Sequence, residues 1–238
     1  MTSLDPPEKL RELRERIDIL ASADPQFRLS DSDLRRFLRG RKGSVDDAFV
    51  ALVEYVQWRR DTGVDSITAE SCEREVNSGK ATVTACGVHG KPTITVLAAK
   101  HDKDKRDVAE MTRFIILTLE TACRCLQPPD ETVVIVFDLL RFSLQCMDYK
   151  VVKRLVYILG HFYPERLQMC YIVHAPVVFD ACWAVIRPWI DPVTVAKVQF
   201  VDEAQLAALL QPADGQNTGD GGGDGGGGGG AAAVECEL

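Results

Sequence analysis

Residues 132–138 read TVVIVFD, with five consecutive apolar residues from Val133 to Phe137. The apolar positions do not alternate with polar ones, which is typical of a strand covered on both faces. Helical periodicity precedes this run at 108–126 and follows it at 147–162. The stretch therefore predicts a buried strand between two crossover helices.

Four further β-branched runs repeat this arrangement on either side. They are TVTAC (82–86), PTITVLA (92–98), MCYIVH (169–174) and AKVQFV (196–201), with another helical pattern at 178–187 and a short one at 203–210. Strands that alternate with helices favour a largely parallel sheet. The predicted fold class is α/β, with a mixed, mostly parallel sheet.

The first 62 residues predict a separate module of helices. Apolar residues recur at helical spacing from Leu10 to Leu20, and two Ser-x-x-Asp patterns, starting at Ser30 and Ser44, predict the N-caps of two more helices. We expect a helical module at 1–62, an α/β domain at 63–212, and a Gly-rich, acidic, disordered tail at 213–238.

Composition argues against several classes of protein. The net charge is -7, but 213–238 carries five acidic and no basic residues. The rest of the chain therefore has a net charge of about -7 + 5 = -2, which does not indicate nucleic-acid binding.

The eight cysteines include one lone C-x-C, Cys123 and Cys125, and no paired metal-ligand spacing, so we expect buried, reduced thiols and no metal. No run approaches the ~20 apolar residues of a membrane span, and the first residues lack the apolar core of a signal peptide. We expect a cytoplasmic monomer.

Two longer stretches carry a resemblance to a known family. SDLRRFLRGRKGSVDDAFVALVEYVQWRRD (32–61) and FYPERLQMCYIVHAPVVFDACWAVIRPWIDPVTVAKV (162–198) resemble the helical module and the central signature of CRAL-TRIO lipid-binding proteins. The resemblance covers 30–202 in order and is closest to the yeast and plant type of phosphatidylinositol transfer protein. It implies that the sheet forms the floor of an apolar lipid cavity, and that a mobile gate helix closes it.

The gate of such proteins maps onto 178–188 and the residues that follow. The resemblance implies that Phe179, Trp183, Ile186 and Trp189, with Val185, cover the lipid tails when the gate is closed and meet the bilayer when it opens. Tryptophan suits that role because its ring tolerates a membrane interface. From the residues alone, the alternative is an amphipathic core helix broken at Pro188.

The resemblance also implies a site for the lipid headgroup. It assigns contacts with an inositol phosphate to Glu165, Thr194 and Lys197, with contributions from Arg41 and Lys42. A phosphate diester needs a cation and hydroxyl or amide donors, and inositol hydroxyls need an acceptor such as a carboxylate.

Local chemistry adds one further expectation about this site. Asp191 followed by Pro192 predicts an N-cap and a single helical turn whose amides face outward and favour anions.

Each of these residues has a simpler interpretation. Glu165 is equally explained as an ion-pair partner of Arg166, and Lys197 as an ordinary charge at a strand edge. The basic pair Arg41 and Lys42 fits a solvated helix face or a patch attracted to anionic lipid.

The predicted function is binding of one phospholipid, with phosphatidylinositol favoured, and its exchange between membranes during transient, peripheral contact. The alternatives are a lipid-sensing scaffold without efficient transfer, and a binder of a sterol or tocopherol-like ligand. An enzyme that uses Asp138, His161 or His174 is not favoured, because no nucleophile elbow, phosphate loop or metal-binding His pair accompanies them. We expect no cofactor besides the lipid ligand.

Overall fold

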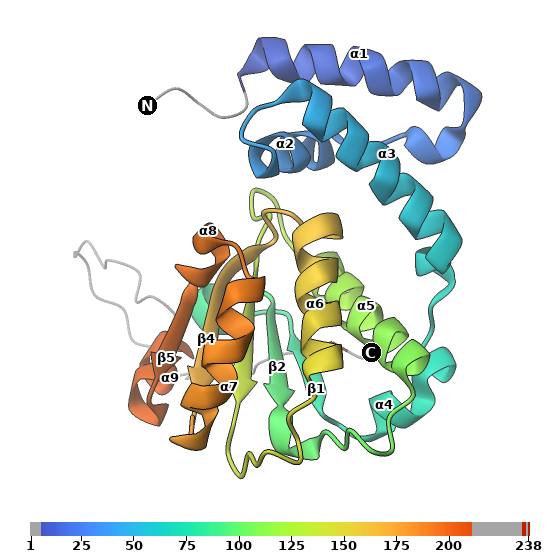
Figure 1. Cartoon of the computed structure of the whole chain (residues 1–238). Helices are drawn as coiled ribbons and strands as arrows, with labels where there is room; N and C mark the ends of the chain where they lie inside the picture. Colours follow the sequence, from blue (N-terminus) through green and yellow to red (C-terminus); the bar gives the residue numbers. More distant parts are fainter. Residues whose placement is uncertain (1–5, 211–234, 237) are drawn as a thin grey trace, which may run out of the picture.

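The computed structural model describes residues 6–210, 235–236 and 238 (Figure 1). Its N-terminal module consists of α1 (Pro7–Ala23), α2 (Asp31–Gly40) and α3 (Val45–Thr62), with a 3-10 turn at Pro25–Phe27. The predicted caps are present: the Ser30 hydroxyl accepts from the Asp33 amide at 3.1 Å, and the Ser44 hydroxyl accepts from the Asp47 amide at 3.3 Å. Side-chain caps of this kind satisfy amides that the first helical turn leaves unpaired.

The sheet has the strand order β5-β4-β3-β2-β1-β6. Its strands are β1 (Ala81–Thr84), β2 (Thr93–Leu97), β3 (Val133–Asp138), β4 (Leu167–Val173), β5 (Val198–Val201) and β6 (Glu235–Cys236). The strands β2, β3, β4 and β5 are mutually parallel, and β1 is antiparallel to both of its neighbours. The prediction of a mixed, mostly parallel sheet is confirmed.

Helices cover both faces of the sheet, as the non-alternating strands indicated. On one face, α5 (Val108–Arg124), α6 (Tyr149–Phe162) and α7 (Val178–Ile186) lie over Ile135 and Phe137 of β3 (Figure 1). On the other face, α9 (Glu203–Leu210) packs against Val134 and Val136 of the same strand. Adjacent residues of β3 are therefore buried on opposite faces.

The remaining elements are short. They are α4 (Glu73–Asn77), α8 (Pro192–Val195), and 3-10 turns at Val64–Ser66, Glu70–Cys72, Val88–Gly90, Ala98–Lys100 and Arg187–Trp189. The helix α8 is the single turn predicted after Asp191. Nowhere in the described residues is a helix both long and apolar enough to cross a bilayer.

The predicted unstructured tail differs from the structure at its end. Most of 213–238 lies outside the described residues, but Glu235 and Cys236 form β6, which pairs with Val83 and Thr84 of β1. The edge of β1 offers unpaired backbone groups that even a two-residue segment can satisfy.

Candidate functional site

Glu165 and Lys197 meet at the amino ends of two parallel strands. Glu165 precedes β4 by two residues, and Lys197 directly precedes its neighbour β5, where its carbonyl accepts from the Cys170 amide at 2.9 Å. The Lys197 Nζ lies 3.9 Å from the Glu165 Oε2 and donates to the Leu167 carbonyl at 2.9 Å. Their side chains are 26% and 37% exposed, so the pair is open to a polar ligand.

The alternative partner of Glu165 is engaged elsewhere. The Arg166 guanidinium donates to the Glu131 carbonyl at 2.9 Å and lies 3.8 Å from the Asp33 carboxylate. The pairing of Glu165 with its sequence neighbour Arg166 is therefore wrong in this structure, and the carboxylate faces Lys197 instead.

Two of the headgroup candidates have left-handed backbone conformations. The φ angle is 58° at Glu165 and 54° at Lys42, in a region that residues with a Cβ rarely adopt. Such residues persist where the surrounding structure fixes them, and they concentrate at functional sites.

Thr194 lies in α8, where the Asp191 carboxylate accepts hydrogen bonds from the first backbone amides of the helix. The Asp191 Oδ1 accepts from the amides of Val193 at 2.9 Å and Thr194 at 3.0 Å. Partial burial alone would raise the pKa of Asp191, but hydrogen bonds from the Thr194 side chain and from these amides lower it. The expectation that these amides face outward for an anion is wrong, because their own cap occupies them. Lys197 is left as the charged donor at this edge.

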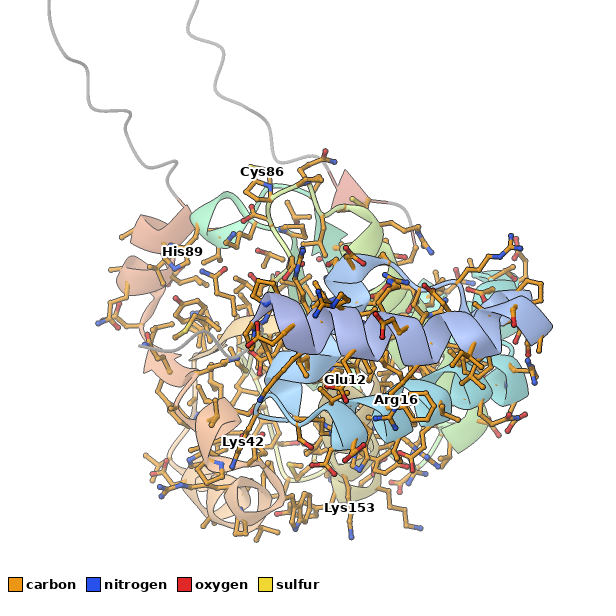
Figure 2. All side chains as sticks on the ribbon, turned by 90° about the horizontal axis from the view of Figure 1, so that it is seen from above. Glu12, Arg16, Lys42, Cys86, His89 and Lys153 are labelled. Atoms are coloured by element: carbon orange, nitrogen blue, oxygen red, sulfur yellow. The ribbon has the colours of Figure 1, made fainter. Side chains whose placement is uncertain are left out.

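The end of α2 approaches the same turn from the helical module. A Cβ atom added at Gly40 would lie 2.9 Å from the Pro164 Cβ, so only glycine allows this approach. The side chains of Arg41 and Lys42, which follow, make no hydrogen bond or ion pair to any described residue. Figure 2 shows Lys42 and Lys153 on one side of the molecule, with Cys86 and His89 toward the other. The structure thus brings Glu165 and Lys197 together, and the Thr194 carbonyl accepts from the Lys197 amide at 3.0 Å. The Thr194 side chain bonds Asp191 instead, and no contact joins Arg41 or Lys42 to this pair among the described residues.

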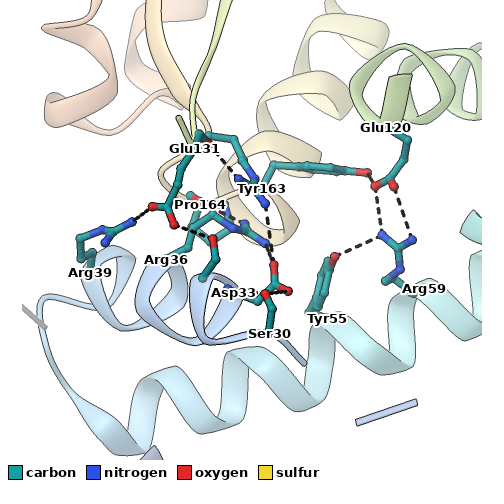
Figure 3. A network of polar contacts seen from close by, with 12 residues as sticks. Ser30, Asp33, Arg36, Arg39, Tyr55, Arg59, Glu120, Glu131, Tyr163 and Pro164 are labelled. Carbon is teal, nitrogen blue, oxygen red and sulfur yellow. Dashed lines mark hydrogen bonds and ion pairs between the residues drawn. The ribbon is translucent and has the colours of Figure 1, made fainter. Parts of the chain in front are cut away.

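A buried ionic cluster holds the turn of Glu165 against the helical module (Figure 3). Arg36 is 1% exposed and donates to the Pro164 carbonyl at 3.1 Å and to the Asp33 carboxylate at 3.1 Å. Burial alone would raise the pKa of Asp33, but hydrogen bonds from Ser30 and Arg36 and the charges of Arg36 and Arg166 lower it. Asp33 is therefore held as a carboxylate between two arginines.

A second cluster continues this contact along α3. The Glu120 carboxylate of α5 accepts from the Tyr163 hydroxyl at 2.6 Å and from the Arg59 guanidinium at 3.0 Å (Figure 3). Burial and the Glu120 charge raise the pKa of Tyr163, which stays a hydrogen-bond donor. Nothing in the sequence pattern indicated these contacts, since Arg59 and Glu120 are 61 residues apart.

The inner face of the predicted gate packs on the sheet. Phe179, Cys182 and Ile186 of α7 are buried in one cluster with Ile172 of β4. Phe179 also contacts Phe142 edge to face, with ring centroids 5.4 Å apart. This side of α7 is ordinary protein core.

The outer face of α7 is apolar as well. Val178 is 40% exposed and Val185 45% exposed, and Ala181 lies exposed between them on the same side of the helix. Asp180 is the one charged residue of the helix. A surface helix normally carries charged residues on its outer face, so the exposed apolar side chains of α7 are unusual for a helix in contact with water.

The two tryptophans of the predicted gate segment lie in α7 and in the 3-10 turn after it. Trp183 is half-buried against Phe200 of β5, with ring centroids 5.7 Å apart. Trp189 contacts the Tyr149 ring edge to face, with centroids 5.9 Å apart, and the Lys153 Nζ lies 6.0 Å from the Trp189 ring centre. Trp183 belongs to α7 and Trp189 to the 3-10 turn that follows it; both indoles are partly exposed, and the Lys153 ammonium lies near the second.

Two residues weighed for catalysis form a pair at the carboxyl edge of the sheet. His174 Nδ1 lies 2.8 Å from Asp138 Oδ1, and its Nε2 lies 3.8 Å from the Glu203 carboxylate of α9. The hydrogen bond to Asp138 raises the pKa of His174. The second nitrogen thus faces another carboxylate instead of a nucleophile, and the pair ties α9 to the sheet.

Across the described ranges, no three His, Cys, Asp or Glu side chains gather as metal ligands.

Comparisons with known proteins agree with this architecture. The family model for the CRAL/TRIO domain matches residues 76–218, more than half of the chain. A CRAL-TRIO domain-containing protein of Schizosaccharomyces pombe is 33% identical over 179 residues, which cover 71% of this chain and 40% of that protein. The phosphatidylinositol transfer protein CSR1 of Eremothecium gossypii is 29% identical over 221 residues, covering 83% of this chain and 51% of that protein. The chain thus spans about half the length, or less, of these two relatives.

A solved structure shares the fold. The crystal structure of Sfh5 superposes with a TM-score of 0.65 at 22% identity, covering 76% of this chain and 67% of that one.

Proposed function

The chain belongs to the CRAL/TRIO domain family, and from that membership we propose that it holds one phospholipid under the gate helix α7 and exchanges it at a membrane surface. The proposed ligand is phosphatidylinositol. No covalent chemistry is needed for this function.

The observation that carries the proposal is the apolar character of both faces of α7. The inner face covers an apolar cluster on the sheet, where acyl chains would replace Phe179, Cys182 and Ile186 as the gate moves outward. The outer face leaves Val178 and Val185 exposed in water, a cost that contact with a bilayer would remove. A helix with these two faces suits a cover that alternates between protein and membrane.

Phosphatidylinositol is favoured by the pairing of Glu165 with Lys197. A phosphate diester would displace Glu165 as the partner of the Lys197 ammonium, and the released carboxylate would accept from inositol hydroxyls. A neutral sterol has neither a charge for Lys197 nor a set of hydroxyls for Glu165. Arg41 and Lys42 would add positive potential, because no described residue neutralises them.

Apolar burial supplies affinity without selecting the lipid. Each buried methylene contributes about 0.8 kcal/mol, and this term is the same for every phospholipid with equal chains. Selection among phospholipids must therefore come from the headgroup contacts.

Native mass spectrometry tests the proposal. The purified chain is incubated with vesicles of phosphatidylcholine, phosphatidylinositol and a sterol, and the retained lipid is extracted and identified. We expect one phosphatidylinositol per chain. A retained sterol would contradict the headgroup assignment, and a chain that retains no lipid would contradict the binding function.

A transfer assay separates exchange from sensing. Labelled phosphatidylinositol in donor vesicles is followed into acceptor vesicles, with and without the chain. We expect transfer in proportion to the amount of chain added. One-to-one binding without transfer would favour the lipid-sensing scaffold.

A further inference from the structure

Cys125 and Cys236 bring two thiols into direct contact. Cys125 is the C-cap residue of α5, and Cys236 lies on β6, 111 residues further along the chain. Their Sγ atoms are 2.7 Å apart, and both side chains are half-buried. The prediction that the cysteines are buried holds for Cys72, Cys170 and Cys182. Cys86 is exposed, and Cys123, Cys146 and the two cysteines of this pair are half-buried.

Backbone and apolar contacts keep Cys236 in this position. It pairs with Val83 of β1, and both Cys236 and Leu238 pack against the core beneath α5. A ladder of two residues is weak by itself, so the described backbone pairing holds Cys236 only loosely. A covalent bond at this point would therefore change how firmly it is held.

We propose that Cys125 and Cys236 form a reversible disulfide, with a low-molecular-weight disulfide such as oxidised glutathione as the oxidant. One cysteine thiolate attacks a sulfur of the oxidant, forms a mixed disulfide and releases one glutathione thiolate. The second cysteine thiolate attacks the protein sulfur of that mixed disulfide and releases the other glutathione. The two cysteines lose two electrons and two protons, and the oxidant is reduced to two thiols.

The sulfur positions need little change for this bond. A disulfide requires its sulfurs at about 2.05 Å, so the two side chains approach by well under 1 Å. Burial and the neighbouring Cys236 raise the pKa of the Cys125 thiol to about 11. Since the thiolate is the reacting form, oxidation is slow at neutral pH and accelerates as the pH rises.

The disulfide would link the two ends of a chain segment that contains about half of the lipid-binding domain. Every element from β3 to α9 lies between Cys125 and Cys236, including the gate and both residues of the Glu165 and Lys197 pair. A cross-link over a loop of this length strongly restricts the unfolded chain. Oxidation would therefore raise the thermal stability of the full chain without touching the lipid contacts.

Peptide mapping tests the assignment. The full chain is incubated natively with oxidised glutathione at pH 8 and quenched with acid for measurement of the intact mass; a second sample is alkylated at near-neutral pH under denaturing conditions and digested. We expect the intact mass to fall by about 2 Da, with a cross-linked peptide pair containing Cys125 and Cys236, which reduction separates. The midpoint of thermal unfolding should rise by roughly 5 °C or more on oxidation.

The neighbouring Cys123 provides the matched control. Cys123→Ser should keep the cross-link, whereas Cys125→Ser and Cys236→Ser should each abolish it together with the thermal shift. If Cys125→Ser disturbs the end of α5, the Cys236→Ser variant alone tests whether the cross-link and the thermal shift are lost. A cross-link from Cys236 to Cys123, a stable glutathione adduct on Cys125 or Cys236, or the absence of the Cys125–Cys236 peptide pair would overturn the proposal. None of these results depends on lipid binding.

Discussion

Lys197 and Glu165, 32 residues apart in the chain, come from two different turns, and their side chains lie within 3.9 Å of each other because β4 and β5 are parallel neighbours. Half-exposed ion pairs of this kind contribute little to stability. The two side chains can therefore change partners with little loss in the free energy of unfolding.

Lys197→Ala should weaken binding of phosphatidylinositol by about 10- to 100-fold, since a charge-assisted hydrogen bond contributes about 1.5–3 kcal/mol. Loss of the bond to the Leu167 carbonyl should lower the free energy of unfolding by only about 1 kcal/mol. Binding is measured by titration with a fluorescent phosphatidylinositol. Lys105→Ala, which removes an exposed lysine paired with Asp102, is the control. Equal affinity of the two variants would remove Lys197 from the site.

Replacement of both outer valines of the gate, Val178→Ser with Val185→Ser, should lower binding to vesicles roughly tenfold, because less apolar surface enters the bilayer. Both side chains are substantially exposed, so the free energy of unfolding should change by no more than about 0.5 kcal/mol per site. Vesicle co-sedimentation and lipid transfer are the measurements. The pair Ile19→Ser with Val50→Ser removes apolar surface of the helical module and should leave vesicle binding unchanged. Equal loss in both pairs would mean that α7 has no special contact with the membrane.

Tryptophan emission should report membrane contact at the gate and not at the helical module. Chains that keep only Trp183 or only Trp189 should shift to shorter wavelength with anionic vesicles, because these half-exposed indoles enter a drier environment. A chain that keeps only Trp58, which stacks on Phe162 at 4.0 Å, should not respond. The opposite pattern would place the membrane contact on the helical module.

Asp33→Asn should destabilise the chain by about 2–3 kcal/mol at pH 7, because it removes the shared carboxylate of Arg36 and Arg166. The folded pKa of Asp33 is lowered, so its contribution is complete above the unfolded value of about 3.9 and disappears as the pH falls through the folded value. The stability difference between wild type and variant should therefore shrink below about pH 4. Urea unfolding between pH 3 and 7 measures it, with the exposed Asp31→Asn as control. A difference that stays constant with pH would show that Asp33 is not held as a carboxylate.

Local patterns were sufficient to predict most elements. The run TVVIVFD became β3 because five apolar residues in succession suit a strand with two covered faces, and Ser30 and Ser44 cap helices through contacts with residues three positions away. The two-residue strand β6 was missed since so short a segment has no periodicity.

The assignment of the site residues stays a prediction, and the contacts around them were not predictable from the sequence. The cap that Asp191 and Pro192 indicated is present, yet the same carboxylate that makes Asp191 a cap accepts from the amides predicted to bind an anion. The contact of Gly40 with Pro164 and the bond from Arg36 to the Pro164 carbonyl join positions more than 100 residues apart. Such pairings depend on how the helical module docks, which a single sequence does not encode in its local spacing.

The helix α7 lies in the crossover between β4 and β5; Lys197 ends this crossover, whereas Glu165 lies before β4, at the same edge of the sheet as Lys197. A headgroup held by both residues would tie the end of the proposed gate segment to the start of β4, and a lipid that contacts only one of them would leave that end unattached. The chain would then select among lipids by how long it retains each one. An inositol lipid would stay bound through many openings of the proposed gate, whereas a lipid with another headgroup would leave at the first opening.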